Sequence, residues 1–512
     1  MTSNFVLHPG KLTFADLRRI CAGYCTIELA DGAWQQIERS RATVEKIIEG
    51  HDTAYGINTG FGLLASTGIP PHQLDDLQKN LVLSHSCGVG NDLPDNVVRL
   101  ISVLKLSSLS QGYSGVRREL VEHLIAFHNA GLVACIPEKG SVGASGDLAP
   151  LAHYAGALMG EGFIRLDGEK LPAPVALDKA GLKPLQLKAK EGLAILNGTQ
   201  VSTALALSAL FDIEKVFGAA VVAGAMSLDA LKGSVAPFDD RIHQIRRQPG
   251  QRDVATLYPA LLKGSGILTS HEKCSKVQDP YSLRCQPQVM GACLDLMRQA
   301  GATLLREADA VTDNPLIFSR EGDVISGGNF HAEPVAFAAD MLAMAVSEIA
   351  ALSERRTAIL VDPKMSGLPA FLVQDSGLNS GFMIAQVTAA ALVSENKTMA
   401  HPSSVDSLPT SANQEDHVSM ATYGARRTGE MARNAATVVG IELLAAAQGI
   451  DFHRPLKTSP ALQIYHDRIR EEVAFYDRDR SFAPDLQKIT EMVLAGEFVA
   501  VAERILPDEE NR

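Results

Sequence analysis

The sequence predicts a mainly α-helical protein, with a central bundle of long helices and a few short β-hairpins at its periphery. The first observation is a set of long stretches rich in Ala, Leu and Met, at 200–232, 288–310, 335–359, 380–400 and 418–448. The second is that 216–226 and 441–447, inside two of these stretches, are apolar nearly all round. Such helices must be surrounded by other helices, which is the environment of a bundle core.

Shorter elements are predicted ahead of the long stretches. Thr13 followed by Asp16 is typical of a helix start, and 26–29 alternates as a short strand does. Apolar residues at helical spacing predict further helices, at 33–50, 74–86, 97–110 and 116–129.

Two hairpins are indicated by turn signals. Asp167-Gly168 separates two short runs within 163–171, and Glu321-Gly322 does the same within 316–325. No internal repeat is visible. We therefore predict one continuous globular unit, with an N-terminal region over 1–200 and a long-helix core and C-terminal helical region over 201–512.

The charge balance restricts the possible partners. The 512 residues carry a formal net charge of −12 and no block of Lys and Arg, which argues against nucleic acid and against an anionic membrane surface. No signal peptide is evident, and 216–226 is too short to span a bilayer. Seven scattered cysteines do not form a disulfide framework. We therefore expect a cytoplasmic protein whose partners are small molecules and other copies of the same chain.

Several familiar sites have no support in the sequence. There is no phosphate-binding loop, no Gly-x-Gly-x-x-Gly between a strand and a helix, and neither Cys-x-x-Cys nor His-Glu-x-x-His for zinc. Ser145 lies in Gly143-Ala144-Ser145-Gly146, which is not the Gly-x-Ser-x-Gly nucleophile elbow. We therefore predict no metal ion.

Two glycine-rich stretches stand out instead. In 140–150, three glycines fall within seven residues, Asp147 follows them and Pro150 closes the stretch. Glycines let a backbone take positive φ and approach itself closely, so this segment is predicted to be sharply bent for a functional reason. The other stretch, 53–62, holds Tyr55 among three glycines; its spacing alone favours an ordinary flexible turn with an exposed tyrosine.

Polar residues cluster at three further places. Gln278, Tyr281 and Arg284 recur at steps of three, as on one face of a tight turn, and could hold a carboxylate. A polar surface turn explains that spacing equally well. The clusters 326–331 and 413–417 each precede a long helix, and on their own they are typical of helix starts.

Together these segments resemble the aromatic amino acid ammonia-lyases, and the histidine-specific members most of all. The resemblance covers nearly the whole chain, and its most specific part is Ala144-Ser145-Gly146 within 140–153. The supporting segments are 53–67, 81–90, 197–200, 276–292, 325–334 and 394–420. The resemblance implies the helical superfold of ammonia-lyases and fumarases, assembled as a homotetramer whose active sites take residues from more than one chain.

In this family Ala-Ser-Gly cyclises to 4-methylidene-imidazol-5-one (MIO), and no external cofactor is required. For this chain the resemblance implies that the amide nitrogen of Gly146 attacks the carbonyl carbon of Ala144. Two waters then leave, and Ser145 becomes an exocyclic methylidene. The residue types suit this chemistry, because glycine lets its nitrogen approach, alanine is small and serine has a hydroxyl to eliminate. Asp147 could assist the dehydration.

The resemblance further implies elimination of ammonia from L-histidine to give trans-urocanate, the first step of histidine degradation. Tyr55 would remove the β-proton. A tyrosine has an ordinary pKa of about 10, so a base near neutrality needs nearby positive charge, for which Arg284 and helix N-termini are candidates. Arg284 would bind the substrate carboxylate. The remaining roles fall to residues that line the MIO and the substrate, Asn197, Gln278, Tyr281 and Phe330, and to residues that face the imidazole, His85 and Glu415.

Two alternatives stay open at this point. A tyrosine or phenylalanine ammonia-lyase, or an aminomutase, would share the scaffold, although relatives that take phenylalanine are typically less polar at the places of His85 and Glu415. On its own, a histidine on an apolar helix face, such as His85, is usually a buried core residue. The other alternative is a catalytically silent helical assembly protein that keeps the fold without MIO.

Overall fold

The structure is a computed structural model that describes residues 3–50, 54–60, 62, 67–271 and 277–508. Helices dominate, which confirms the predicted fold class. The chain divides into two compact units. The first unit comprises Met1–Ser208, Ala302–Asp340 and Pro402–Arg426, and the second comprises Ala209–Gly301, Met341–His401 and Arg427–Arg512.

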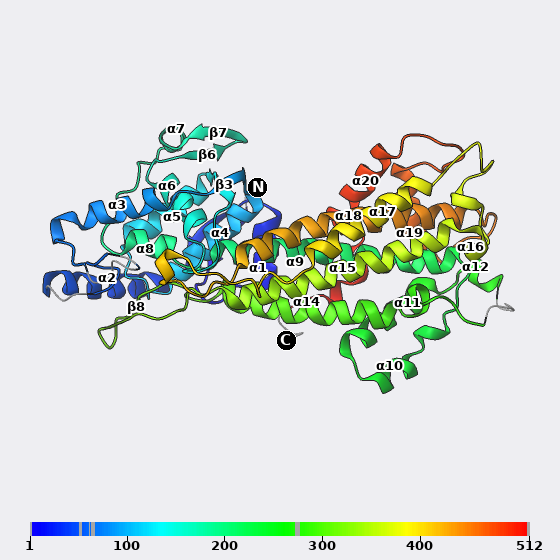
Figure 1. The fold of residues 1–512 in the computed structure, drawn as a ribbon, viewed down its shortest axis with the longest axis horizontal. Helices are drawn as coiled ribbons and strands as arrows, with labels where there is room; N and C mark the ends of the chain where they lie inside the picture. The colour runs from blue at the N-terminus through cyan, green and yellow to red at the C-terminus, as the bar shows by residue number, and fades with distance from the viewer. Residues whose placement is uncertain (1–2, 51–53, 61, 63–66, 272–276, 509–512) are drawn as a thin grey trace. The chain divides into compact units, whose positions relative to one another are not determined.

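The first unit carries the shorter helices, coloured blue to cyan in Figure 1. They are α1 (Phe14–Ala22), α2 (Gly32–Gly50), α3 (Leu74–His85), α4 (Asp95–Ser110), α5 (Arg118–Asn129), α6 (Leu148–Leu158), α7 (Ala173–Lys179) and α8 (Glu191–Leu196). Thr13 and Asp16 form a capping box that starts α1, because each side chain accepts the backbone N–H of the other residue. The predicted helix start is therefore confirmed.

The strands of the described residues form small two- and three-stranded sheets. The pairs are β1 (Ser3–Leu7) parallel with β2 (Cys25–Leu29), and, antiparallel, β3 (Val89–Asp92) with β5 (Pro137–Lys139), β4 (Val133–Ala134) with β6 (Phe163–Leu166), β6 with β7 (Glu169–Pro172), and β8 (Leu316–Phe318) with β9 (Asp323–Ile325). Both predicted hairpins, β6–β7 and β8–β9, are confirmed. Asp167 and Gly168 turn the first of them with φ of 51° and 81°, as a tight hairpin requires.

Long helices run through the second unit and lie side by side in Figure 1. They are α9 (Gln200–Ala230), α14 (Gln286–Ala308), α15 (Glu333–Val361), α17 (Met383–Met399) and α18 (Ala421–Asp451). Each matches one of the five predicted stretches to within a few residues, so the helix bundle is confirmed. The predicted division near residue 200 stays a prediction, since α9, α14, α15 and α18 each belong in part to both units.

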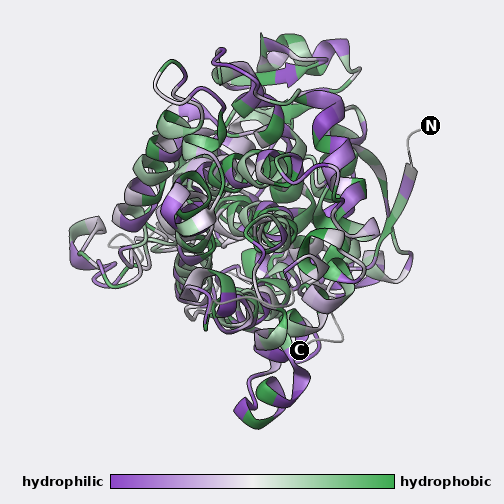
Figure 2. Cartoon of the chain, turned by 90° about the vertical axis from the view of Figure 1, so that its right-hand side faces the viewer, coloured by the Kyte–Doolittle hydropathy of each residue, from purple (hydrophilic) through white to green (hydrophobic). Residues whose placement is uncertain are grey.

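Shorter helices complete the second unit. They are α10 (Asp240–Arg246), α11 (Pro249–Leu262), α12 (Gly266–Thr269), α13 (Tyr281–Arg284), α16 (Pro363–Ser366), α19 (Pro460–Glu472) and α20 (Ala483–Leu494). Figure 2 shows hydrophobic residues along the long helices, and Val216 and Leu443 are fully buried there. This is the environment that their apolar sequences predict.

A buried ion pair joins the long helices inside this apolar core. Arg356 of α15 donates to Glu442 of α18 at 2.5 and 2.7 Å, and both side chains are fully buried. Ser227 of α9 donates to the same carboxylate at 2.6 Å. Because a buried charge is costly when its partner is misplaced, this contact fixes three helices in one register.

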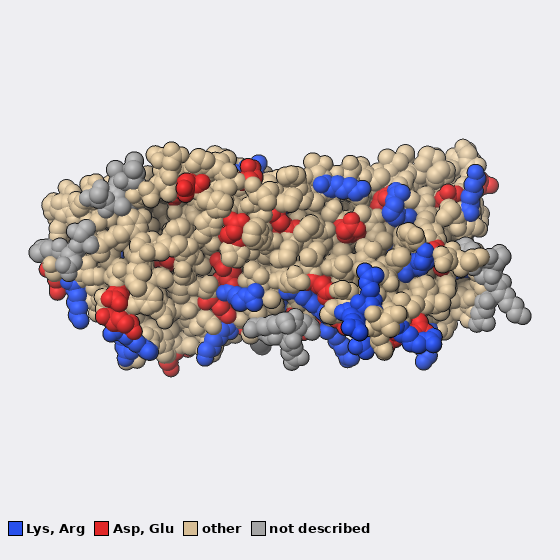
Figure 3. All heavy atoms as spheres, turned by 60° about the horizontal axis from the view of Figure 1, so that its bottom comes forward, with Lys and Arg blue, Asp and Glu red and all other residues tan. Residues whose placement is uncertain are grey.

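The surface seen in Figure 3 shows acidic and basic side chains interspersed among larger uncharged areas. Among the helices of the described residues, one, α15, is long and apolar enough to cross a membrane by length and composition alone. However, 67% of its most apolar window is buried within the fold, which is the behaviour of a core helix.

Candidate active site

A cavity of about 1120 Å³ lies in the first unit. Its walls come from segments far apart in the sequence: the last turns of α3 and α8 and the loops that precede α6, α15 and α18. The predicted site residues among its lining are Tyr55, His85, Ala144, Ser145, Asn197, Phe330 and Glu415. Long-range packing thus gathers these residues around one space large enough for an amino acid.

The loop before α6 is bent as its glycines predict. Gly143 and Gly146 have φ of 66° and 71°, in the left-handed region that favours glycine. A Cβ on Gly146 would lie 2.1 Å from the carbonyl oxygen of Gly198, so a side chain there would collide with the backbone. The N–H of Asp147 donates to that same carbonyl at 2.8 Å. Residue 146 must therefore be glycine for the two segments to meet.

Ser145 makes hydrogen bonds through both its side chain and its backbone. Its hydroxyl donates to Oε1 of Glu415 at 2.9 Å, and its carbonyl accepts the side-chain N–H of Asn197 at 3.1 Å. Asn197 directly follows the last turn of α8, and its extended backbone turns the side chain out of the helix. Oδ1 of Asn197 is buried and has no hydrogen-bond partner among the described residues. Ser145 is thus fixed between a carboxylate and an amide.

Asp147 is the last residue of this loop, directly before α6, and is fully buried. It accepts hydrogen bonds from the N–H and hydroxyl of Ser202 at 2.7 and 2.9 Å, and from the hydroxyls of Thr422 and Ser141 at 2.5 and 3.2 Å. Burial raises the pKa of Asp147 in spite of these hydrogen bonds, so the carboxyl group holds a proton more readily than an exposed aspartate does. The sequence indicated Asp147 but not its partners Ser202 and Thr422, which are 55 and 275 positions away.

His85 and Glu415 form a polar part of the cavity wall. His85 ends α3, and its Nδ1 lies 3.0 Å from the hydroxyl of Ser84. Burial lowers the pKa of His85, while the charge of Glu415 acts in the opposite direction. Oε2 of Glu415 accepts hydrogen bonds from Thr410 and Ser411 at 2.9 and 2.8 Å, which fixes the carboxylate. This wall could receive a polar ring with one donor and one acceptor.

Tyr55 lies on the same cavity, in the glycine-rich loop that the sequence indicated. The N–H of Gly62 points to its hydroxyl oxygen at 3.5 Å. Thr53 and Phe61, which belong to the same loop, lie outside the described residues.

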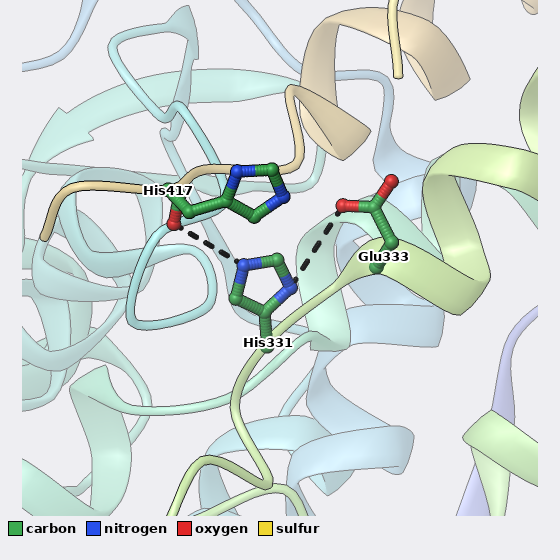
Figure 4. Close-up of side chains that lie close together, drawn as sticks. All are labelled: His331, Glu333 and His417. Atoms are coloured by element: carbon green, nitrogen blue, oxygen red, sulfur yellow. Dashed lines mark hydrogen bonds and ion pairs between the residues drawn. The ribbon is translucent and has the colours of Figure 1, made fainter. Parts of the chain in front are cut away.

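Two histidines that the sequence showed only as parts of helix starts, His331 and His417, also line the cavity. Figure 4 shows them beside Glu333. Nε2 of His331 donates to the carbonyl of His417 at 3.2 Å, and its Nδ1 lies 3.9 Å from Glu333. One ligand atom from each side chain falls within 4.8 Å of the others, close enough to hold a metal ion. The two rings lie 12° from parallel with their centroids 5.7 Å apart, and the hydrogen bond from His331 to the carbonyl of His417 joins the loops before α15 and α18. We interpret His331, Glu333 and His417 as a polar contact between the segments that lead into α15 and α18.

Gln278, Tyr281 and Arg284 are placed differently from the other predicted residues. They belong to the second unit, and they are not among the residues that line this cavity. Tyr281 and Arg284 begin and end the single turn α13, with the guanidinium 4.7 Å from the centre of the Tyr281 ring. Tyr281 is 72% exposed, so this face is open to another molecule.

Comparisons with known proteins agree with this architecture. The aromatic amino acid lyase family matches residues 12–471. A histidine ammonia-lyase from Aromatoleum aromaticum is 61% identical over 492 residues, which is 96% of this chain and 94% of the relative. Among solved structures, a histidine ammonia-lyase from Trypanosoma cruzi is 41% identical with a TM-score of 0.91, covering 99% of this chain and 96% of that one.

A tyrosine aminomutase from Streptomyces globisporus has the same TM-score of 0.91 at 34% identity, covering 99% of both chains. The scaffold is therefore shared by lyases and aminomutases, and the fold alone does not select between them. The match over most of the length and the high identity to relatives decide the family: the chain belongs to the aromatic amino acid lyases.

Proposed function

We propose that this lyase removes ammonia from L-histidine to give trans-urocanate, using an MIO group formed from Ala144, Ser145 and Gly146. The observation that carries the proposal is the placement of His85 and Glu415 on the same cavity as Ala144 and Ser145. A histidine side chain and a carboxylate together can pair with both nitrogens of an imidazole. The histidine ammonia-lyases among the relatives support the same substrate.

The residues around the triplet fit its cyclisation. The nitrogen of Gly146 would bond to the carbonyl carbon of Ala144. That carbonyl oxygen would leave as one water with the amide hydrogens of Gly146 and Ser145, and the Cα hydrogen and hydroxyl of Ser145 would leave as the other. Gly146 lies so close to Gly198 that residue 146 has no room for a side chain, and the loop is tightly bent there. Asp147, with its raised pKa, is a buried acid that can move protons beside the loop.

The finished MIO would supply an electrophilic carbon that captures the substrate amine and makes ammonia a better leaving group. The chain's own residues do the rest. Tyr55 takes the β-proton, which requires its hydroxyl to face the substrate across the cavity. Glu415 and His85 hold the imidazole and so fix the side chain relative to Tyr55. Asn197 holds the carbonyl of Ser145 and fixes the orientation of the triplet.

Gln278, Tyr281 and Arg284 would complete this site from another copy of the chain in a homotetramer. Their absence from the cavity lining and the exposure of Tyr281 are in keeping with such an arrangement. Arg284 would bind the substrate carboxylate, for which a planar guanidinium is well suited. We place this enzyme in the cytoplasm, in a degradative pathway for histidine.

Intact mass and a urocanate assay together test the proposal. A chain that has formed MIO is lighter than its sequence by two waters, and purified enzyme given L-histidine should release urocanate. A chain of unmodified mass would instead favour the catalytically silent alternative. Release of coumarate or cinnamate from tyrosine or phenylalanine, with no urocanate from histidine, would point to a lyase of different substrate choice.

A further inference from the structure

Lys105 is a buried lysine whose side chain ends beneath the candidate site. It lies in α4 between the buried residues Leu104 and Leu106 and is 1% exposed. Its Nζ donates to the carbonyl oxygen of Asn197 at 2.7 Å and to that of Ala194 at 3.3 Å. Lysine is almost never fully buried unless it is paired, so its place here needs an explanation.

The carbonyl that Lys105 binds belongs to the segment that shapes the triplet. The side-chain amide of Asn197 donates a hydrogen bond to the carbonyl of Ser145 at 3.1 Å. The next residue, Gly198, receives the N–H of Asp147 and lies against Gly146. Gly198 has a φ of 125°, in a region that favours glycine. Because glycine has no Cβ, it adopts many other conformations as readily. The turn therefore depends on external contacts for its position.

The buried surroundings of Lys105 make the charged ammonium group, which donates these hydrogen bonds, unfavourable in free energy. Burial lowers the pKa of Lys105 to about 7, with Asp313 and Asp147 acting to raise it and Lys190 to lower it. Asp313 is itself paired with Lys190 at 2.7 Å, so it is not a dedicated partner of Lys105. A methionine would fill a similar volume without burying a polar group. The two carbonyl hydrogen bonds are what distinguish lysine from methionine at this position.

We propose that Lys105 is a positioning residue for the reaction, which anchors the Asn197–Gly198 turn against the Ser145–Gly146 segment. The proposal rests on the proposed function, since the consequence of this anchoring is correct closure of the triplet and correct orientation of its carbonyl. Lys105 does not touch the substrate cavity itself and acts through Asn197.

The test replaces Lys105 with Met in the full-length chain and compares it with Ser102→Ala. Ser102 lies one turn earlier on α4 and is also buried, but its partner is Tyr154 and not Asn197. Both variants are made alongside the wild type in a time course of synthesis. Intact mass then gives the rate of loss of two waters, thermal unfolding reports folding, and kcat and KM are measured per matured chain.

We expect Lys105→Met to fold, to lose its waters about tenfold more slowly, and to show a kcat about tenfold lower, the scale of one lost hydrogen bond to a charged group. KM should stay within about threefold, because the binding wall is untouched. Ser102→Ala should behave as the wild type in both readouts. Lys105→Gln, which is neutral but keeps N–H donors, should lie between Lys and Met.

Wild-type maturation and kcat in a folded Lys105→Met variant would overturn the positioning role. If Lys105→Met does not fold, Lys105→Gln takes its place in the same comparison. Failure of both variants to fold would also overturn the proposal, by making Lys105 a purely structural residue. Retention of both waters by the wild type and by Ser102→Ala alike is a different result, because it removes the proposed function on which the role of Lys105 rests.

Discussion

The hydroxyl of Ser145 donates a hydrogen bond to the carboxylate of Glu415 at 2.9 Å, although the two residues are 270 positions apart. One side chain belongs to the loop before α6 and the other to the loop before α18. The contact places an acidic group directly at the residue that would become the methylidene. The other oxygen of the Glu415 carboxylate accepts hydrogen bonds from Thr410 and Ser411, so Glu415 links Ser145 to the segment before α18.

Replacing Glu415 with Gln should lower kcat/KM for L-histidine by about 10- to 100-fold, the scale of one hydrogen bond to a charged group. Thr410 and Ser411 can still donate to the amide oxygen, so folding should be retained. Intact mass should still show the loss of two waters. Thr410→Val, which removes a neutral contact to Glu415, is the matched control and should have a smaller effect. Equal activity of Glu415→Gln and wild type would place the imidazole elsewhere.

Replacing Ser145 with Ala should leave the fold intact and lower turnover by about three orders of magnitude or more, because the residue that supplies the methylidene carbon is gone. The side chain is small, and its loss removes one hydrogen bond, to Glu415. Intact mass should show a chain that has lost neither water. Turnover near the wild-type rate would exclude MIO chemistry at this triplet.

Replacing Tyr55 with Phe should keep MIO but lower kcat by about 10²- to 10⁴-fold, the usual contribution of a positioned acid or base. The ring still fills its part of the cavity, so thermal stability should change little. The loss of two waters, seen by intact mass, is the internal control that the triplet has matured. Full activity in this variant would assign proton removal to another residue.

The sequence was sufficient for the long helices because their signal is local. Residues 216–226, within the predicted stretch 200–232, are apolar nearly all round, and the structure ends α9 at Ala230, two positions short of the prediction. The hairpin at Asp167-Gly168 was equally predictable, since the turn residues dictate the backbone there. These helices and this hairpin can be predicted without knowing which residues pack against them.

The site was less predictable because its parts meet through long-range packing. Spacing alone made Tyr55 an exposed turn residue and His85 a core residue; the family resemblance placed both in a site, and the structure puts them on one cavity. No resemblance or periodicity pointed to Thr422 as a partner of Asp147, or to Lys105 as a partner of Asn197. Such contacts depend on which faces of distant helices meet, which one sequence does not encode locally.

A last prediction concerns the stability of the first unit at acidic pH. His128, in the last turn of α5, is 4% exposed, its Nε2 donates to the carbonyl of Cys25 at 3.0 Å, and its ring stacks on Tyr24. Burial lowers the pKa of His128 to about 4 from its ordinary value of 6.5. Between these values the unfolded chain binds a proton that the folded chain excludes. The contribution of His128 to stability is therefore fully present above pH 6.5 and is lost as the pH falls toward 4.

His128→Gln should remove this dependence, because glutamine keeps an N–H donor for Cys25 but does not titrate. The free energy of unfolding in urea should fall more steeply for the wild type than for the variant between pH 7 and pH 4, by about 3 kcal/mol in total for a pKa difference of this size. His72→Gln, at an exposed histidine, controls for the loss of an imidazole as such. Parallel pH profiles of wild type and His128→Gln would show that His128 accepts its proton as readily in the folded chain as in the unfolded one.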